Sequence, residues 1–202
     1  MDAPRLRRRT HVWARRLHVY TSMVAFVIIL FFGITGITLN HPTWTFGDDA
    51  QRTTTSGTFP FDTTDDGTAE GEVQYLGIAE HVRSEAGVSG SVDSFGVTGD
   101  EGSIVFTNPG YSAEVTFDLT SRDYELIVDQ QGFVAVLNDL HKGRDTGSAW
   151  AWVIDAAAGF LVLVSVTGLV MQAFLRRNRT AAFVTAGVGA ILTVALIVLT
   201  VI

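Results

Sequence analysis

The sequence predicts a membrane α-helical protein with three transmembrane helices and a small extracytoplasmic α+β domain inserted between the first and second helix. Apolar runs occupy residues 19–40, 149–175 and 181–202, and Asp155 is the one charged residue in them. About 20 apolar residues in a helix cross the roughly 30 Å apolar layer of a bilayer. The acidic residues lie elsewhere, because residues 41–148 contain 19 Asp and Glu against 5 Lys and Arg.

The charge distribution predicts the orientation of the chain in the bilayer. Residues 1–18 contain six arginines against one aspartate, and Arg176, Arg177 and Arg179 follow the second apolar run. Basic segments stay in the cytoplasm. We therefore expect a cytoplasmic N-terminus, with residues 41–148 and the C-terminus outside. The first apolar run is longer than a signal-peptide core and lacks a small-residue cleavage site, so it is predicted to stay as an anchor.

The region between the first two apolar runs shows a helix followed by short strands. Residues 43–68 are rich in Thr, Asp and Gly and are predicted to form an exposed connector. Helical periodicity covers 69–86, and Gly87 is expected to end that helix. Alternating apolar residues and turn signals then predict an antiparallel sheet with one buried face. Its strands are expected at 92–98, 103–107, 113–119 and 124–129, giving a domain over about 69–130, and a further helix is expected at 133–140.

Small and weakly polar residues form a stripe on each of the first two spans, and such faces allow helices to approach closely. On the first span the stripe comprises His18, Ser22, Ala25, Ile29, Gly33, Gly36 and Asn40; on the second it comprises Asp155, Ala158, Val162, Ser165, Leu169 and Gln172. We expect these two faces to pack together, and Thr185, Gly189 and Thr193 to bring the third helix into the bundle.

Asp155 lies about two turns inside the second span, where an unpaired carboxylate costs a few kcal/mol. It therefore needs a partner near the outer end of the helices. The candidates are His41, His141, Lys142 and Arg144.

Histidines stand at the ends of the spans and are the candidate ligand residues. Imidazole from packed helices is a common haem ligand, and His41 and His141 both lie at the outer end of the spans. The two either face each other as ligands or remain at the headgroup level, bonded to lipid or to Asp155. His18 lies 23 residues before His41, about 35 Å along a helix, so these two cannot share one iron. A site at His18 would need His11, a second protomer or another subunit.

Several function classes have no support in the sequence. It contains no HExxH, GxSxG or phosphate-binding glycine loop, and it has no cysteine for thiol chemistry or disulfides. The basic N-terminus is explained by topology and anionic lipid, so no nucleic-acid partner is expected. His81 lies on the predicted acidic helix and is expected to be a surface residue.

Several motifs along the chain resemble those of the PepSY-associated transmembrane-helix family of bacterial membrane proteins. They are Leu17-His18, Thr35 to Pro42 (TGITLNHP), Leu140 to Gly143 (LHKG), Val153-Ile154-Asp155 and Thr167-Gly168-Leu169. The segment between the spans is similar to a PepSY domain. The resemblance implies a multi-pass protein of the bacterial inner membrane. The chain is also similar to the membrane core of ferric-siderophore reductases, which hold b-type haem through histidines.

Two functions follow from the resemblance and stay open. One is a b-type haem electron-transfer component linked to ferric iron reduction, a haem-dependent membrane oxidoreductase or a subunit of one, with His41, His141 and His18 as cofactor-binding residues. The other is a non-enzymatic anchored PepSY module that binds or regulates an extracytoplasmic protein through its sheet edge or acidic face. In both, the lipid bilayer is a partner, and other membrane subunits or a second protomer are further candidates.

Overall fold

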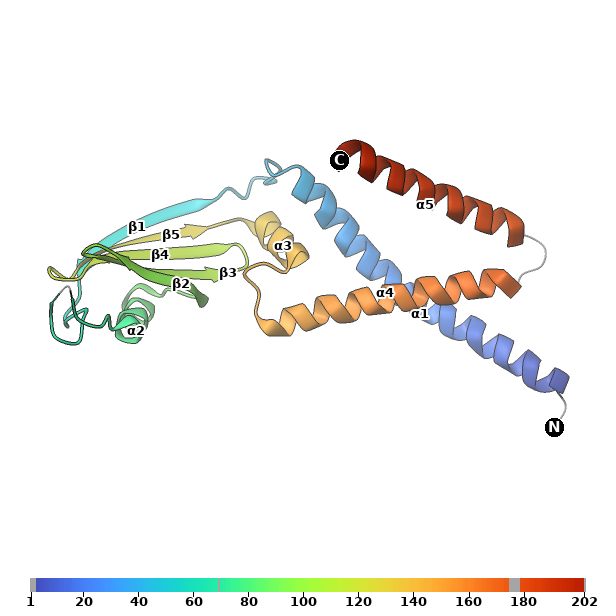
Figure 1. Cartoon of the computed structure of the whole chain (residues 1–202), viewed down its shortest axis with the longest axis horizontal. Coiled ribbons are helices and arrows are strands. Elements are labelled where there is room, and N and C mark those ends of the chain that lie inside the picture. Colours follow the sequence, from blue (N-terminus) through green and yellow to red (C-terminus); the bar gives the residue numbers. More distant parts are fainter. Residues whose placement is uncertain (1–2, 69, 175–178, 202) are drawn as a thin grey trace. The chain divides into compact units, whose positions relative to one another are not determined.

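The structure, a computed structural model, describes residues 3–68, 70–174 and 179–201. The chain divides into two compact units (Figure 1). We call them the helical unit, which comprises Met1–Leu30 and Asp155–Ile202, and the sheet unit, which comprises Phe31–Ile154.

Among the described residues, three helices have the length and composition needed to cross a membrane: α1 (Ala3–Asn40), α4 (Ser148–Phe174) and α5 (Arg179–Val201). Their apolar segments are Arg15–Asn40, Ser148–Gln172 and Arg179–Thr200. The sheet and its short helices lie between α1 and α4 in the sequence, so the predicted fold class is confirmed. Three spans of this kind also make the chain a multi-pass membrane protein.

The packing face of α4 is one residue out of phase with the predicted stripe. Partly buried residues recur at helical spacing along α4, whereas every member of the predicted stripe, from Asp155 to Gln172, is exposed. The partly buried residues are Ile154, Ala157, Phe160, Leu161, Val164, Thr167, Gly168 and Met171. On α1 the prediction is better, since Ala25 is buried and His18 and Ser22 are half-buried.

The third helix does not pack as expected. Thr185, Gly189 and Thr193 are exposed, and the two threonine hydroxyls donate to carbonyl oxygens of their own helix. The prediction that these residues join the bundle was therefore wrong.

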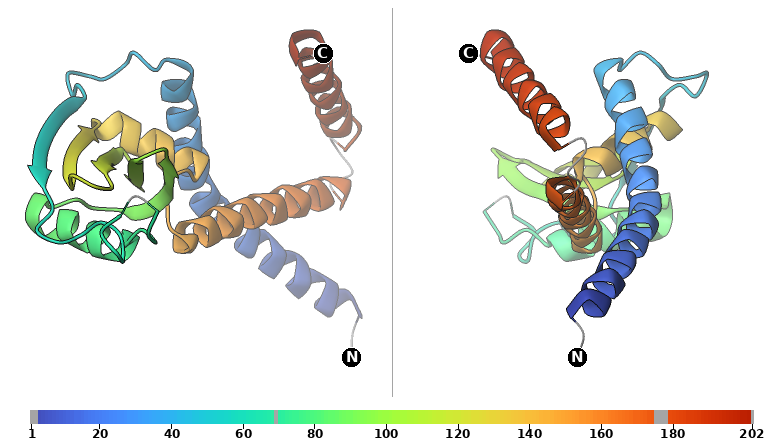
Figure 2. Two further views of the ribbon diagram at one scale, coloured as in Figure 1. Left: turned by 60° about the vertical axis from the view of Figure 1, so that its left-hand side comes forward. Right: turned by 90° about the vertical axis from the view of Figure 1, so that its right-hand side faces the viewer.

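The sheet has five antiparallel strands in the order β1-β5-β4-β3-β2, and Figure 2 shows its twist. They are β1 (Gln51–Thr58), β2 (Ser91–Thr98), β3 (Glu101–Asn108), β4 (Tyr111–Asp118) and β5 (Asp123–Gln130). The last four correspond to the predicted strands. β1 lies inside the segment that we predicted to be only a connector, so that part of the prediction was wrong. β1 and β2 are the two edges of the sheet.

Helix α2 (Tyr75–Ala86) covers one face of the sheet through Ile78, Ala79 and Val82. It begins later than predicted, but it ends at Gly87, whose φ of 66° is the left-handed conformation that glycine adopts without strain. The buried core also includes Phe59, Val88, Ile104, Phe106, Ala113, Val115, Phe117, Leu119 and Leu126. Phe59 comes from the predicted connector, which is therefore partly buried.

Helix α3 (Phe133–Lys142) confirms the last predicted element and leads back to the spans. Asp48 accepts the backbone N–H of Phe133 at 2.6 Å and thus caps the start of the helix. At the other end Gly143, with φ of 68°, closes the helix by donating its N–H to carbonyl oxygens of the last turn. This short helix places His141 beside α1.

Candidate functional site

His141 packs against the C-terminal part of α1. Its Nδ1 lies 2.6 Å from Oγ1 of Thr35, and its ring meets Phe32 edge-on with the ring centres 5.0 Å apart. A side chain on Gly36 would point toward Cε1 of the same imidazole, 3.7 Å away. Thr35 is 1% exposed, so the hydrogen bond to His141 is shielded from water on the threonine side.

The hydrogen bonds of Thr35 determine which nitrogen of His141 carries the proton. The hydroxyl has one hydrogen, and it donates that hydrogen to the carbonyl oxygen of Phe31 at 2.7 Å. Toward His141 the hydroxyl must therefore accept, so Nδ1 carries the proton. A neutral imidazole in this arrangement has its free lone pair on Nε2, the atom that could bind a metal or accept a proton.

Contacts at both sides of His141 hold α3 in place. Oγ1 of Thr38 lies 2.6 Å from the side-chain oxygen of Asn138. The carboxylate of Asp139, which is buried, accepts the N–H of Gly110 at 2.9 Å. The indole N–H of Trp150 donates to the carbonyl oxygen of Leu140 at 2.8 Å. Because these bonds come from three different segments, the position of His141 depends on the fold of the whole sheet unit.

A second contact of the same kind occurs in the helical unit. His18 on α1 has its Nδ1 3.3 Å from Oγ1 of Thr167 on α4, and its Cε1 lies 3.3 Å from the position of a Cβ on Gly168. Thr167 also donates its hydroxyl hydrogen to a backbone carbonyl, that of Val164, at 2.9 Å. His18 therefore also carries its proton on Nδ1 when neutral. Each histidine thus packs on a Thr-Gly pair of another helix.

His41 is exposed and has different neighbours. Its Nδ1 lies 3.0 Å from the carbonyl oxygen of Ile37, which can only accept, so Nδ1 carries the proton and Nε2 is again free. Its ring stacks on Trp44, with the centres 4.1 Å apart. Among the described residues, no hydrogen bond or ring contact joins His41 to His141. No group of three His, Asp or Glu side chains suited to a metal ion occurs there either.

The two polar residues predicted for the spans are both exposed. Within the helical unit Asp155 has no hydrogen bond or ion pair to a described residue, and its pairing at the outer end stays a prediction. Arg144, one of the expected partners, is engaged with Asp139 at 3.7 Å and with Asp145 at 3.4 Å. Asn40 ends α1 and is exposed. Arg176 and Arg177 and the side chain of His11 lie outside the described residues.

His81 is not a simple surface residue. It is half-buried on α2, and its ring meets Phe59 and Phe61 edge-on at 5.4 and 5.6 Å between ring centres. The prediction of a surface position was therefore wrong. The acidic residues around it on the sequence suggested an exposed face, but the helix turns the imidazole into an aromatic cluster that includes Tyr124.

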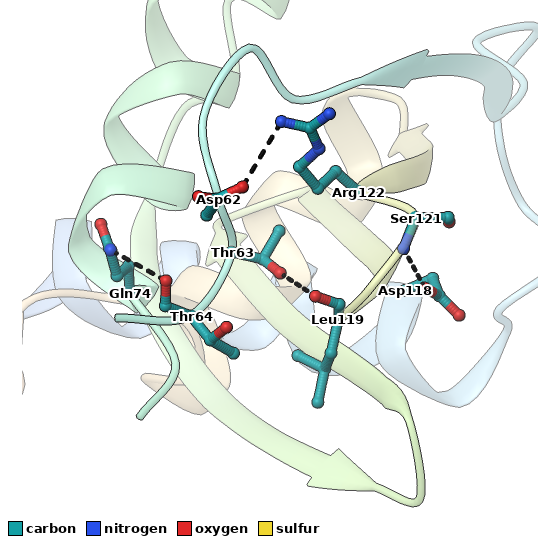
Figure 3. Close-up of polar contacts among 8 residues, drawn as sticks. All are labelled: Asp62, Thr63, Thr64, Gln74, Asp118, Leu119, Ser121 and Arg122. Atoms are coloured by element: carbon teal, nitrogen blue, oxygen red, sulfur yellow. Dashed lines mark hydrogen bonds and ion pairs between the residues drawn. The ribbon is translucent and has the colours of Figure 1, made fainter. Parts of the chain in front are cut away.

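The segment before α2 is fastened to the turn between β4 and β5 (Figure 3). The hydroxyl of Thr63 donates to the carbonyl oxygen of Leu119 at 2.8 Å, and Arg122 pairs with Asp62 at 3.4 Å. In the turn itself, the backbone N–H groups of Ser121 and Thr120 hold the pKa of the Asp118 carboxyl below its usual value. All these polar groups are used in fixing the loop, so the cluster has a structural role.

Sequence reasoning missed Thr35 and Thr167 as the partners of the histidines. A signal was available, because the first span contains Thr35-Gly36-Ile37 and the second Thr167-Gly168-Leu169, while Leu17-His18 and Leu140-His141 match each other as well. The pattern indicates an internal repeat in which a Leu-His pair is followed by a Thr-Gly pair.

Comparison with known proteins places the chain in a family. The model of the family described as PepSY_TM-like matches residues 12–202. No curated protein and no solved structure matches the chain.

Proposed function

Because the chain belongs to the PepSY_TM-like family of membrane proteins, we propose that it binds a b-type haem at the Thr35 end of α1 and transfers electrons in ferric iron reduction. His141 would hold the haem iron through its free Nε2. His41 would be a second ligand or a near neighbour of the haem.

The observation that carries the proposal is the contact between His141 Nδ1 and Thr35, from which we assign the ring proton to Nδ1. The bond from Nδ1–H to Thr35 leaves Nε2 free and orients the ring. Histidines that bind a metal almost always donate their other ring N–H to a protein oxygen in this way. His41 meets the same condition through Ile37. The donor chemistry of both residues therefore fits haem iron.

Bound haem would supply one-electron chemistry, and the residues of this chain would set its position and its surroundings. Thr35 orients the imidazole of His141, and Phe32 covers one edge of that ring. An apolar neighbourhood and a hydrogen bond to the ligand are the means by which a protein adjusts the potential of a haem. His18, with its proton directed to Thr167, is the corresponding candidate at the other end of the spans. A site there would need a further ligand from a second protomer or another subunit.

The test is a reduced-minus-oxidised absorption spectrum of the purified protein, produced with an ample haem supply. We expect a b-type spectrum that is lost in His141→Ala. His81→Phe is the matched control, because it removes an imidazole but keeps an aromatic ring in the cluster around Phe59. A wild-type protein without haem absorption, or a His141→Ala variant with an unchanged spectrum, contradicts the proposal.

The proposed orientation follows from the charge distribution. The N-terminus and the segment around residue 178 face the cytoplasm, and the sheet unit faces outward, because basic segments are retained inside. Reporter fusions at residues 110 and 178 should report opposite sides of the membrane. The same side for both would show that the orientation is wrong.

A further inference from the structure

The two edges of the sheet differ in chemistry. β1 consists of the residues QRTTTSGT. It has no apolar side chain and is almost fully exposed. β2 carries three exposed apolar residues, Val92 at 39%, Phe95 at 62% and Val97 at 44% exposure. An edge strand offers a row of unpaired backbone N–H and C=O groups, and proteins usually protect it with charges. β1 therefore has a polar edge, whereas β2 presents three exposed apolar side chains among its polar residues.

The apolar residues of β2 all lie on the face of the sheet that α2 covers. They stand opposite Phe106, Ile104 and Gly102 of β3, respectively, and both Phe106 and Ile104 are in the buried core. Residues directly opposite in a sheet point to the same face. The core layer therefore continues beyond α2 onto the free edge and is left uncovered there.

Helix α2 borders the exposed apolar residues of β2 and adds to their surface. Tyr75, at the start of α2, packs on Phe95 with the ring centres 4.5 Å apart. Arg83 donates to the carbonyl oxygen of Gly90, just before β2, so that flank of α2 faces β2. Leu76 lies seven residues before Arg83, two turns away on the same flank, and is 72% exposed. We call the surface formed by Leu76, Tyr75, Val92, Phe95 and Val97 the β2 edge strip.

Two glycines in the sheet are covered by an aromatic ring from a neighbouring strand, but the glycine of β2 is not. Gly57 of β1 is paired with Tyr124 and Gly102 of β3 with Phe117, and in both pairs the aromatic ring covers the glycine. Gly96 of β2 pairs with Ser103 and has nothing within 4 Å of its Cβ position. A strand added at the free side of β2 could place a large side chain over Gly96.

We propose that the β2 edge strip binds an extended basic segment of another polypeptide, which adds a sixth strand to the sheet. Backbone hydrogen bonds to β2 give this mode of binding its affinity, and alternate side chains give it specificity. Apolar side chains of the segment lie on Phe95 and Val97, and its Lys or Arg side chains face the acidic surroundings.

Charge decides between such a segment and a second copy of this chain. Residues 41–148 carry 19 acidic and 5 basic residues, a net charge of −14. Asp93 lies in β2, and Asp100 and Glu101 follow at its end. Pairing two β2 strands would bring two such surfaces together, whereas a basic segment is attracted to them. The proposal does not depend on haem, since binding at β2 uses none of the histidines discussed above.

The test uses the full-length protein in detergent micelles and two labelled peptides, Lys-Val-Lys-Phe-Lys-Val-Lys and the same sequence with Glu in place of Lys. Fluorescence anisotropy measures binding, and hydrogen exchange locates it. We expect the basic peptide to bind at least about ten-fold more tightly than the acidic one, because like charges oppose association. We also expect it to slow exchange in residues 91–98 and to leave residues 51–58 unchanged.

Val97→Lys is the test variant, since an inward charge on an edge strand blocks strand addition. It should weaken binding of the basic peptide by about ten-fold or more. Thr55→Lys is the matched control: Thr55 stands opposite buried Leu126 on the other edge, so it adds the same charge on the same face. Circular dichroism of both variants checks that they fold.

Absence of peptide binding, equal binding of the two peptides, or protection outside β2 would each overturn the proposal. Concentration-dependent protection of residues 91–98 without any peptide would assign the strip to a second copy and also overturn it. The haem spectrum of the same samples reports separately on the proposed electron-transfer function.

Discussion

The two histidine–threonine contacts are made of the same residue types but are supported differently. His141 lies on a short helix, α3, that separate bonds from Asn138, Asp139 and Leu140 tie to other segments. His18 lies within the long helix α1 and depends only on the packing of α1 against α4. The distances differ accordingly, at 2.6 Å for His141 to Thr35 and 3.3 Å for His18 to Thr167.

This difference indicates which histidine is held well enough to serve as a ligand. A separation of 3.3 Å is at the long end for a hydrogen bond, so the ring of His18 is less firmly oriented than that of His141. A ligand that is fixed before binding costs less to order when the cofactor binds. We therefore expect the Thr35 end of the spans to be the stronger site, and the predictions below test that ranking.

Thr35→Val should have the largest effect. Valine has nearly the shape of threonine but cannot accept the proton of His141 Nδ1, so the ring loses its fixed tautomer. Loss of such an outer partner usually lowers metal affinity by about 10- to 100-fold. Titration of the haem-free protein with haem, followed by absorbance, measures the affinity.

Thr167→Val is the paired variant. Because Thr167 contacts His18 and not His141, this variant should leave the haem affinity at the Thr35 end unchanged. Nitrogen NMR of the histidine rings gives a readout that does not need haem. It should show Nδ1–H for His141 in the wild type and a mixture in Thr35→Val. Equal haem affinity of wild type and Thr35→Val would contradict the role given to this bond.

Asp139→Ala should have the next largest effect, and on the sheet unit alone. The buried N–H of Gly110 would lose its acceptor, which costs about 1–3 kcal/mol of stability. Thermal unfolding followed by circular dichroism measures the loss. Asp145→Asn is the control, since Asp145 pairs with an exposed arginine, Arg144, and such pairs contribute about 0–1 kcal/mol. Asparagine also tolerates the left-handed φ of 58° at this position. Equal losses in the two variants would show that the Gly110 bond is unimportant.

Substitution of the glycines beside the histidines should disturb His18 more than His141. An added Cβ at Gly168 would lie 3.3 Å from Cε1 of His18, closer than carbon atoms normally pack, whereas at Gly36 the distance to His141 is an ordinary 3.7 Å. Gly168→Ala should therefore displace His18 by a few tenths of an ångström, and Gly36→Ala should leave His141 in place. Ring proton shifts of the two histidines report the displacement. A larger change in Gly36→Ala would contradict the packing described.

Much of this arrangement could be predicted because the signals are local. The spans follow from apolar runs, α2 and α3 from helical periodicity, and Gly87 from its place after the last periodic residue. β1 was missed because its polar residues show no alternation. It is a strand only because β5 pairs with it, and that pairing joins residues far apart in the sequence.

The candidate site was harder to predict for the same reason. His141 and its partner Thr35 are 106 positions apart, and the pattern named the histidines but not their partners. The stripe on α4 was placed one residue out of phase because that helix is largely apolar on all sides, so Asp155, Ser165 and Gln172 were taken to mark its packing face. Packing instead uses Gly168, where the absence of a side chain lets His18 approach.

The smallest of the effects considered is a pH-dependent contribution to the stability of the sheet unit. In the sheet unit, the N–H groups of Ser121 and Thr120 lower the pKa of Asp118 from its ordinary value of 3.8. A carboxyl with a lowered folded-state pKa stabilises the fold above its ordinary pKa, and this contribution is lost as the pH falls through the folded-state value. Asp118→Ala should therefore lower the melting temperature of the sheet unit near neutral pH, and the difference from wild type should shrink below about pH 4. A difference for Asp118→Ala that grows as the pH falls would have the wrong sign and would show that the turn does not hold the ionised carboxylate.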